Sequence, residues 1–485
     1  MAENGEPGAP GQPSVRRRAL GGVLSLAGRD VALKLLAFGG WIALARLLDP
    51  ATFGLFAVAS FALSVFALFS QLGLGASVVR DRSEVDRPRL DALFTLQLAV
   101  VAGIALLTAA AAPLLALAAN DAGLGWLVVA LAAALVLLSL RSVPAAMQER
   151  DLAYGAPVLA DIVTQVTFWT VAIGGAWAGW SIWSVVASVL ASSALGTVVL
   201  LVRTRWRPAL NFGWRAVKGE ALFGLMYASQ SLAHFAKYAM LPGLGGPLYG
   251  ATALGYLTWA HQVAALPVQI AQPVSRVAYP ALAHLQHVGD EFARLAADTL
   301  AWACRLTFPV FAVLIGLAPQ VTEHIYGEQW IPAVGTLVLL SAAMAVGVPV
   351  NVLVPALYSL GRGRAGMALS LGWTALTWVA AGAFAAAGMG YDALAAGYVV
   401  GSAVALAAVL YALRDIGPAR LLRAMALPTA TGAAAGLAAY GASGLVDGLA
   451  GLLVVGGAIG VLALAANLWP ERARGRALLG ALRRG

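Results

Sequence analysis

Long apolar stretches recur along the whole chain and alternate with short polar loops. A helix needs about 20 mostly apolar residues to cross the hydrocarbon core of a bilayer. Alternating polar and apolar residues, the pattern of a transmembrane strand, are absent from these stretches. We therefore predict an all-α polytopic membrane protein with about 14 transmembrane helices.

Composition supports this fold class. Hydrophobic residues make up 61% of the 485 residues and charged residues only 11%, whereas a soluble domain carries about 25% charged residues. The predicted spans are 20–47, 52–79, 92–118, 124–140, 156–177, 181–202, 221–241, 253–279, 300–317, 331–360, 365–387, 393–413, 426–442 and 449–466. The single cysteine, Cys304, excludes a disulfide framework. The five histidines lack the spacing of a metal site, so neither a metal nor a cofactor is expected.

Basic residues set the predicted orientation. The two termini and the even-numbered loops carry 25 of the 31 lysines and arginines. Loops rich in Lys and Arg stay in the cytoplasm, so both termini are expected there. The net charge of +9 is thus attributed to topology and to contacts with anionic membrane lipids, and nucleic acid is not an expected partner.

The order of the spans predicts six parts of the chain. They are a disordered cytoplasmic N-tail (1–19), an N-terminal six-helix bundle (20–202), a basic linker (203–218), a C-terminal six-helix bundle (219–413), two additional helices (426–466) and a basic cytoplasmic tail (467–485). A weak repeat relates the halves: Phe53-Gly54 with Ala59 matches Leu254-Gly255 with Ala260. Paired halves are typical of transporters that rock about a site near the middle of the bilayer.

Charged and polar residues inside spans are costly, and they usually mark function. In the first span, Asp30 and Lys34 are four residues apart and can pair on one helix face. Arg29 precedes them, and as an alternative its long side chain could reach the membrane surface and serve as an anchor.

Polar stripes at helical spacing follow in three more spans. The fifth span carries Asp161 and Gln165, the seventh carries Tyr227, Gln230, Ser231, His234, Lys237 and Tyr238, and the eighth carries Gln262, Gln269, Gln272 and Arg276. We predict that these faces line one hydrated cavity in which bases outnumber acids. Such a cavity would suit an anionic ligand rich in hydroxyl groups. The alternative is hydrogen bonding between helices without a ligand.

Three motifs resemble those of a known family. They are Leu44-Ala45-Arg46-Leu47-Leu48-Asp49-Pro50-Ala51-Thr52-Phe53-Gly54, the stretch from Ala253-Leu254-Gly255-Tyr256 to Tyr279-Pro280-Ala281-Leu282, and Tyr326-Gly327-Glu328-Gln329-Trp330-Ile331-Pro332-Ala333. Over residues 20–413 the chain resembles oligosaccharide flippases of the polysaccharide transporter family, in the multidrug/oligosaccharidyl-lipid/polysaccharide exporter superfamily. Locally, the first motif is expected to form a turn and a helix start. The third is expected at the membrane surface, where Trp and Tyr concentrate.

The resemblance implies a fold and a function. It implies two six-helix bundles around a central cavity plus two C-terminal helices, in the bacterial cytoplasmic membrane. It implies export of undecaprenyl-diphosphate-linked repeat units for surface polysaccharide by alternating access, beside a polymerase and other assembly proteins. On that pattern Arg29, Lys34, Lys237 and Arg276 are candidates for contacts with the ligand. Many relatives carry an acid in the outer half of the seventh helix, where this chain has Lys237, so ion coupling there is in doubt.

Two other functions stay open at this point. A drug or cation antiporter of the same superfamily would need an acidic cavity, which these residues do not predict. A membrane glycosyltransferase or polymerase would resemble proteins with a large outer loop, and no loop here exceeds about twenty residues. No acid–base pair or phosphate loop is found, so an enzyme is not expected. A driving proton could bind Asp30, Asp161 or His234.

Overall fold

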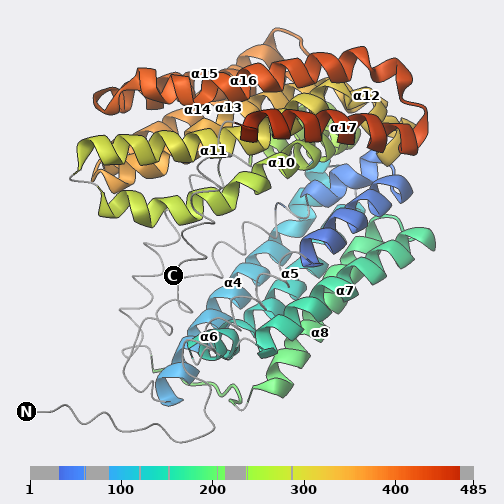
Figure 1. Cartoon of the computed structure of the whole chain (residues 1–485). Coiled ribbons are helices and arrows are strands. Elements are labelled where there is room, and N and C mark those ends of the chain that lie inside the picture. The colour runs from blue at the N-terminus through green and yellow to red at the C-terminus, as the bar shows by residue number, and fades with distance from the viewer. Residues whose placement is uncertain are drawn as a thin grey trace, which may run out of the picture. The chain divides into compact units, whose positions relative to one another are not determined.

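The computed structural model describes residues 32–58, 61, 87–119, 122–150, 153, 155–204, 206–213, 236, 239–285 and 288–469. Every regular element in these ranges is a helix, which confirms the all-α prediction. The chain forms two compact units (Figure 1). Unit 1 comprises Met1–Leu48 and Ala59–Leu232, and unit 2 comprises Asp49–Val58 and Ala233–Gly485. The predicted bundle boundaries stay predictions, because residues 214–235 lie outside the described ranges.

Unit 1 is a bundle of long helices. Its described elements are a helix over residues 32–47, α4 (Arg87–Ala119), α5 (Ala122–Ser139), α6 (Ser142–Arg150), α7 (Gly155–Trp177) and α8 (Ile182–Arg203). Helix α7 packs along α8, and α5 packs against both α4 and α8, so these helices lie side by side in Figure 1. The predicted span 124–140 corresponds to α5, and the chain then continues as the short helix α6.

Small residues let the helices of unit 1 approach closely, which is the usual basis of packing between membrane helices. Along α8, the buried side chains include Ser184, Ser188, Ser192 and Ser193. Ser188 satisfies its hydroxyl by donating to the carbonyl oxygen of Val185 at 2.7 Å. This serine is therefore buried with its hydroxyl bonded within its own helix.

The first part of the basic linker is fixed to unit 1. Trp206 is buried and packs edge-on against Phe94 of α4, with ring centroids 5.6 Å apart. The backbone amide of Asn211 donates to the hydroxyl of Thr95 at 2.8 Å, and its side-chain amide donates to the carbonyl oxygen of Pro88 at 2.8 Å. Residues 206–213 thus run along one end of α4.

Unit 2 contains the remaining helices. Its described elements are residues 50–58, a π-helical turn (Leu241–Gly245), α10 (Gly246–His284), α11 (Gly289–Gly316), α12 (Ala318–Val321), a second π-helical turn (Thr322–Tyr326), a 3-10 segment (Glu328–Ala333), α13 (Val334–Ser359), α14 (Gly363–Ala386), α15 (Asp392–Ala412), α16 (Pro418–Gly441) and α17 (Gly448–Leu468), with short 3-10 turns at Arg414–Ile416 and Ser443–Leu445. In α10 the backbone leaves helical geometry at Gly250, where φ is 83° and ψ is 175°. Positive φ at this point suits glycine, which has no Cβ to clash.

The core of unit 2 forms where α10, α11, α13, α14 and α15 meet. Leu300, Cys304, Leu353, Leu357 and Val409 are completely buried there. Helices α16 and α17 pack on α11, so the last two helices belong to this unit rather than forming a separate one.

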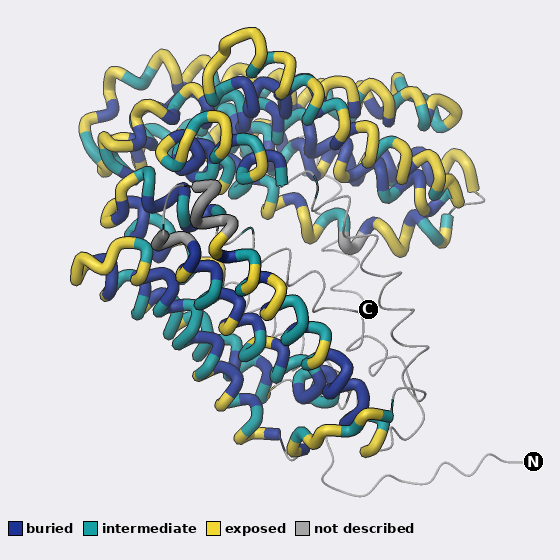
Figure 2. The backbone as a smooth tube through the Cα atoms, turned by 180° about the vertical axis from the view of Figure 1, so that it is seen from behind, coloured by how far each residue is buried: buried dark blue, intermediate teal, exposed yellow. Residues whose placement is uncertain are grey.

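The outer surfaces of the helices are apolar. Figure 2 shows exposed residues along both units, and on α17 they include Leu453, Val454, Val461 and Leu462 with 63–69% exposure. Within the described ranges, nine helices are long and apolar enough to cross a membrane. Contact with lipid carries no free-energy cost for such apolar surfaces, whereas contact with water is unfavourable. The chain is a multi-pass membrane protein, and the total of 14 helices stays a prediction.

Candidate functional site

In unit 1 the helix over residues 32–47 packs on α7. Trp41 meets Trp169 edge-on with ring centroids 6.1 Å apart. Gly40 lies so close that a Cβ there would come within 2.1 Å of the indole of Trp169. Lys34 precedes Trp41 by seven residues and therefore shares its helix face. These helices are the first and fifth predicted spans, for which the predicted topology gives the same direction, so helix register would place Lys34 near the level of Ile162 on α7.

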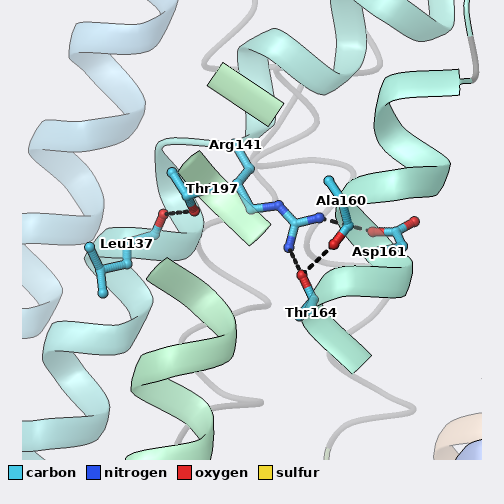
Figure 3. A network of polar contacts seen from close by, with 6 residues as sticks. All are labelled: Leu137, Arg141, Ala160, Asp161, Thr164 and Thr197. Carbon is cyan, nitrogen blue, oxygen red and sulfur yellow. Dashed lines mark hydrogen bonds and ion pairs between the residues drawn. The ribbon is translucent and has the colours of Figure 1, made fainter. Parts of the chain in front are cut away.

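A polar network lies on α7 at that level (Figure 3). Arg141, just after the end of α5, donates from Nη2 to the carboxylate of Asp161 at 2.9 Å and from Nη1 to the hydroxyl of Thr164 at 3.0 Å. Thr164 in turn donates to the carbonyl oxygen of Ala160 at 2.7 Å. The side chain of Arg141 is 15% exposed and that of Asp161 is 40% exposed.

A glycine of α8 makes room for this network. A Cβ on Gly196 would lie 2.0 Å from the Thr164 hydroxyl and 3.1 Å from Nη1 of Arg141. The neighbouring Thr197 donates to the carbonyl oxygen of Leu137 on α5 at 2.9 Å (Figure 3). Three helices therefore converge on the pair of charges formed by Arg141 and Asp161.

The pairing changes how the predicted site is interpreted. Sequence reasoning placed Asp161 and Gln165 on a cavity face and assigned Arg141 to topology alone. The structure shows that Arg141 is a cationic partner of Asp161. Such a partner is needed because an acid inside a membrane span is costly unless a cation neutralises it. The sequence did contain a signal for this ion pair. Arg141 directly follows the predicted span 124–140, and Asp161 lies near the start of the next span, 156–177.

In unit 2 the predicted stripe lies on α10. Gln262, Gln269 and Gln272 are all exposed on this helix. The backbone at position 276 is helical, which keeps Arg276 on the same stripe by register. Exposed amides on a helix of a membrane protein need water or a polar ligand, because lipid offers no hydrogen-bond partner.

Several predicted site residues lie outside the described ranges: Arg29, Asp30, Tyr227, Gln230, His234 and Lys237. Lys34 is exposed in unit 1. The prediction that all these residues share one cavity therefore stays a prediction. Among the residues that the structure describes, no group of three or more histidine, cysteine or acidic side chains could hold a metal ion.

The first sequence motif starts a helix, as expected. Asp49 accepts hydrogen bonds from the backbone amide of Thr52 at 2.9 Å and from its hydroxyl at 2.7 Å. Pro50 follows as the first helical residue, a position where its missing N–H costs nothing. Burial raises the pKa of the Asp49 carboxyl, but the hydrogen bonds from Thr52 and Ala51 lower it more, and the result lies below its ordinary value.

All three motifs meet in one cluster of aromatic rings, here called the aromatic junction: Phe53, Tyr256, Trp259, Tyr326 and Trp330. Trp330 is central and completely buried. It stacks on Trp259 with ring centroids 5.1 Å apart, and it meets Phe53 edge-on at 5.1 Å and Tyr256 at 6.2 Å. Tyr326 meets Trp259 at 5.2 Å.

Within the aromatic junction, Trp330 and Tyr326 of the third motif are 0% and 5% exposed. Their rings pack against other aromatic side chains, where edge-on and offset contacts are favourable. The expected position of this motif at the membrane surface stays a prediction.

These motifs also carry a family assignment. Residues 43–335 match the family described as polysaccharide biosynthesis protein. The match covers more than half of the chain and includes all three motifs. The chain belongs to this family.

Curated relatives of this chain agree with the assignment. The teichuronic acid biosynthesis protein TuaB of Bacillus subtilis (strain 168) is 28% identical over 38% of this chain and 38% of its own length. The lipopolysaccharide biosynthesis protein WzxC of Escherichia coli (strain K12) is 22% identical over 71% of each chain. The succinoglycan biosynthesis transport protein ExoT of Rhizobium meliloti (strain 1021) is 24% identical over 66% of this chain and 65% of its own.

Solved structures establish the fold of the chain. The lipid II flippase MurJ, in an inward closed conformation, superposes with a TM-score of 0.71 at 12% identity over 91% of this chain and 99% of MurJ. An inward-facing multidrug resistance MATE transporter of the MOP superfamily gives a TM-score of 0.62 at 15% identity over 83% of this chain and 99% of the transporter. The chain thus has the fold of these two solved membrane proteins.

Proposed function

We propose that this protein is a flippase. It moves an oligosaccharide linked to undecaprenyl diphosphate from the cytoplasmic to the outer leaflet of a bacterial cytoplasmic membrane, for surface polysaccharide synthesis. The observation that carries the proposal is family membership over residues 43–335 together with relatives named for polysaccharide biosynthesis and transport. The MurJ fold supports it, since one solved structure of that fold is a lipid II flippase.

The chemistry of the predicted stripes supports the same proposal. A diphosphate cannot enter hydrocarbon on its own, because burying an ion without a partner of opposite charge is very costly. Burying it in a cavity lined by fixed cations costs far less. Lys34 and Arg276 would hold the phosphate oxygens through charge-assisted hydrogen bonds. The exposed amides of Gln262, Gln269 and Gln272 would serve the sugar hydroxyls. The lipid tail would stay in the bilayer throughout.

Within this proposal Arg141 is a positioning residue rather than a ligand contact. Its guanidinium is mostly buried and already donates to Asp161 and Thr164. Lys34 is exposed, and its helix register would place it near the same level. Unit 1 would therefore offer Lys34 to the ligand, while Arg141 keeps the carboxylate of Asp161 neutralised beside it.

The alternatives of an antiporter and an enzyme each predict something different. An antiporter for cationic drugs would bind its substrate on acids, whereas the candidate residues of this chain contain more bases than acids. A glycosyltransferase or polymerase would turn over a lipid-linked sugar in detergent, where no barrier separates two compartments. A flippase would leave that lipid chemically unchanged.

The test is reconstitution in sealed vesicles that carry a fluorescent undecaprenyl-diphosphate oligosaccharide in one leaflet. We expect protein-dependent appearance of the sugar on the opposite leaflet, measured by access to a glycosidase that cannot cross the membrane. The same protein in detergent should leave the substrate intact by mass spectrometry. Turnover in detergent, or equal access with and without protein, would exclude the proposed function.

A further inference from the structure

Helix α11 carries charged residues along the face that it does not bury. Glu291, Arg294 and Asp298 are exposed, Trp302 is 38% exposed, and Arg305 is partly exposed. These five residues follow one another at intervals of three and four, so they form one stripe along the helix, here called the α11 stripe. Charged side chains on a membrane helix are costly unless they have polar partners, which lipid chains do not supply.

The neighbours of α11 show what the stripe meets. The opposite face packs on α10 and α13, and Phe292 and Leu300 are completely buried there. Helix α16 packs along one side, where a Cβ on Gly432 would lie 3.4 Å from the Cβ of Phe308. Helix α17 packs near the far end of α11, and its own outer surface is apolar. The exposed stripe therefore meets the lipid that surrounds these helices.

The charges at the very start of α11 are matched within the protein. Oδ2 of Asp290 lies 2.7 Å from Nη2 of Arg294, and Oδ1 of Asp290 lies 2.9 Å from Nη1 of Arg420 on α16. Asp298 and Arg305 lie deeper along the stripe. They are seven residues apart, or about 10 Å along the helix axis, whereas ion pairs on one helix join residues three or four apart.

The predicted span 300–317 indicates the depth of these two residues. Asp298 lies just outside the apolar span, and Arg305 lies five residues inside it. Long side chains on a helix point back toward its start, so the guanidinium of Arg305 can reach the level of the lipid headgroups. The ring of Trp302 lies between the two residues, 5.7 Å from the guanidinium carbon of Arg305. Trp favours this interfacial zone. An acid thus lies on the water side of the zone and a base on the hydrocarbon side.

The headgroup of phosphatidylethanolamine has the opposite order of charges. Its primary ammonium group lies on the water side, and its phosphate lies next to the glycerol, nearer the hydrocarbon. We propose that the α11 stripe binds this headgroup, with Arg305 donating to the phosphate and Asp298 accepting from the ammonium group. Arginine has five N–H donors, so Arg305 can hold a phosphate oxygen beside its other contacts.

The order of charges selects among lipids. Phosphatidylglycerol offers a phosphate to Arg305 but no cation to Asp298. Phosphatidylcholine offers a cation without any N–H donor, so its contact with the carboxylate is weaker. The proposed site goes beyond the proposed function, because binding of a bulk phospholipid needs neither the lipid-linked oligosaccharide nor its translocation.

The experiment measures lipid binding by the full chain purified in detergent. Phosphatidylethanolamine, phosphatidylglycerol and phosphatidylcholine with identical acyl chains are titrated separately, and native mass spectrometry gives an apparent Kd for each lipid. Asp298→Asn removes the proposed partner of the ammonium group. Glu291→Gln is the matched control, because it removes an exposed acid from the same helix face two turns nearer the start of α11.

We expect the wild-type protein and Glu291→Gln to bind phosphatidylethanolamine most tightly. Asp298→Asn should bind it roughly tenfold more weakly, the loss expected for one hydrogen bond between charged groups, and should bind phosphatidylglycerol as before. Arg305→Gln should weaken the binding of all three lipids, which provides a second test if Asp298→Asn fails to fold. Equal binding of the three lipids, tighter binding of phosphatidylglycerol, or an ethanolamine preference that survives in both variants would overturn the proposal.

Discussion

Arg141, in the turn between α5 and α6, donates to Asp161 of α7 at 2.9 Å although the two residues are 20 positions apart. The arginine is the more buried partner, and replacing it with alanine removes the donor to the Asp161 carboxylate and to the Thr164 hydroxyl. Arg141→Ala should lower stability by about 1–3 kcal/mol. Asp161→Asn should cost less, because the amide keeps a hydrogen-bond acceptor. Thermal unfolding in detergent measures both variants.

The double variant identifies the interaction itself. If the charges are coupled, Arg141→Ala with Asp161→Asn should cost less than the sum of the single changes. Arg294→Ala is the matched control. Nη2 of Arg294 lies 2.7 Å from Oδ2 of Asp290, four residues earlier, and both side chains are 63% exposed. Removing this exposed ion pair should change stability little. Additive effects for Arg141 and Asp161 would contradict the coupling.

Gly196 tests the space beside this network. Gly196→Ala would bring a Cβ within 2.0 Å of the Thr164 hydroxyl, so Thr164 must move and its bond with Arg141 must break. We expect a lower midpoint of thermal unfolding, as overpacking typically costs about 1–3 kcal/mol. Adding Thr164→Ala should recover part of that loss because it removes the clashing hydroxyl.

Gly174→Ala on α7 is the control for this pair, since a Cβ there would meet nothing within 4 Å. It should be neutral or slightly stabilising, because alanine favours a helix more than glycine does. A loss at Gly174 as large as that at Gly196 would indicate a general intolerance to alanine, and the explanation from the Thr164 contact would be wrong.

Hydropathy alone predicted many of the helices because the length of an apolar run is a local property. The predicted span 181–202 became α8 at Ile182–Arg203, and 393–413 became α15 at Asp392–Ala412. The span 300–317 was too short at its start. Helix α11 begins at Gly289, and its first turns carry Asp290 and Glu291, which an apolar window cannot include.

Contacts between helices could not be predicted in the same way. In a membrane the lipid-facing and protein-facing sides of a helix are both apolar, so hydropathy does not show which face is inside. The burial of Trp330 and the pairing of Arg141 with Asp161 therefore appeared only in the structure. The motif around Gly54 and the weak repeat were visible in the sequence, but the close approach of Gly54 to the backbone of Ala251 depends on how two distant segments cross.

Low pH should weaken the ion pair between Arg362 and Asp415, which lie just after the ends of α13 and α15. Nη1 of Arg362 donates to Oδ1 of Asp415 at 2.9 Å, and a second bond joins Nη2 to Oδ2. The hydrogen bonds from Arg362 lower the pKa of Asp415 below its ordinary value of 3.8. Because the folded pKa is the lower one, the stabilisation is complete above the ordinary value and is lost as pH falls through the folded value.

The size of this effect is limited by exposure. The two side chains are 40% and 49% exposed, so the pair should contribute about 0.2–1 kcal/mol. Asp415→Asn should lower the unfolding midpoint at pH 7 and have no further effect near pH 2, where wild-type and variant should coincide. An unchanged difference between them at both pH values would show that the charge of Asp415 is not involved.

The proposed ligand contacts make the sharpest functional prediction. Lys34→Ala combined with Arg276→Ala should abolish flipping of the lipid-linked oligosaccharide while the protein still folds, because the diphosphate would lose both cations. Flipping in vesicles and the elution profile in detergent measure the two properties separately. Arg364→Ala removes an exposed arginine from the first turn of α14 and should leave flipping unchanged. Retaining the charge should restore part of the activity, so Lys34→Arg with Arg276→Lys should flip faster than the double alanine variant. Normal flipping by the double alanine variant would show that the ligand does not depend on these cations, and the cavity would have to be sought on other helix faces.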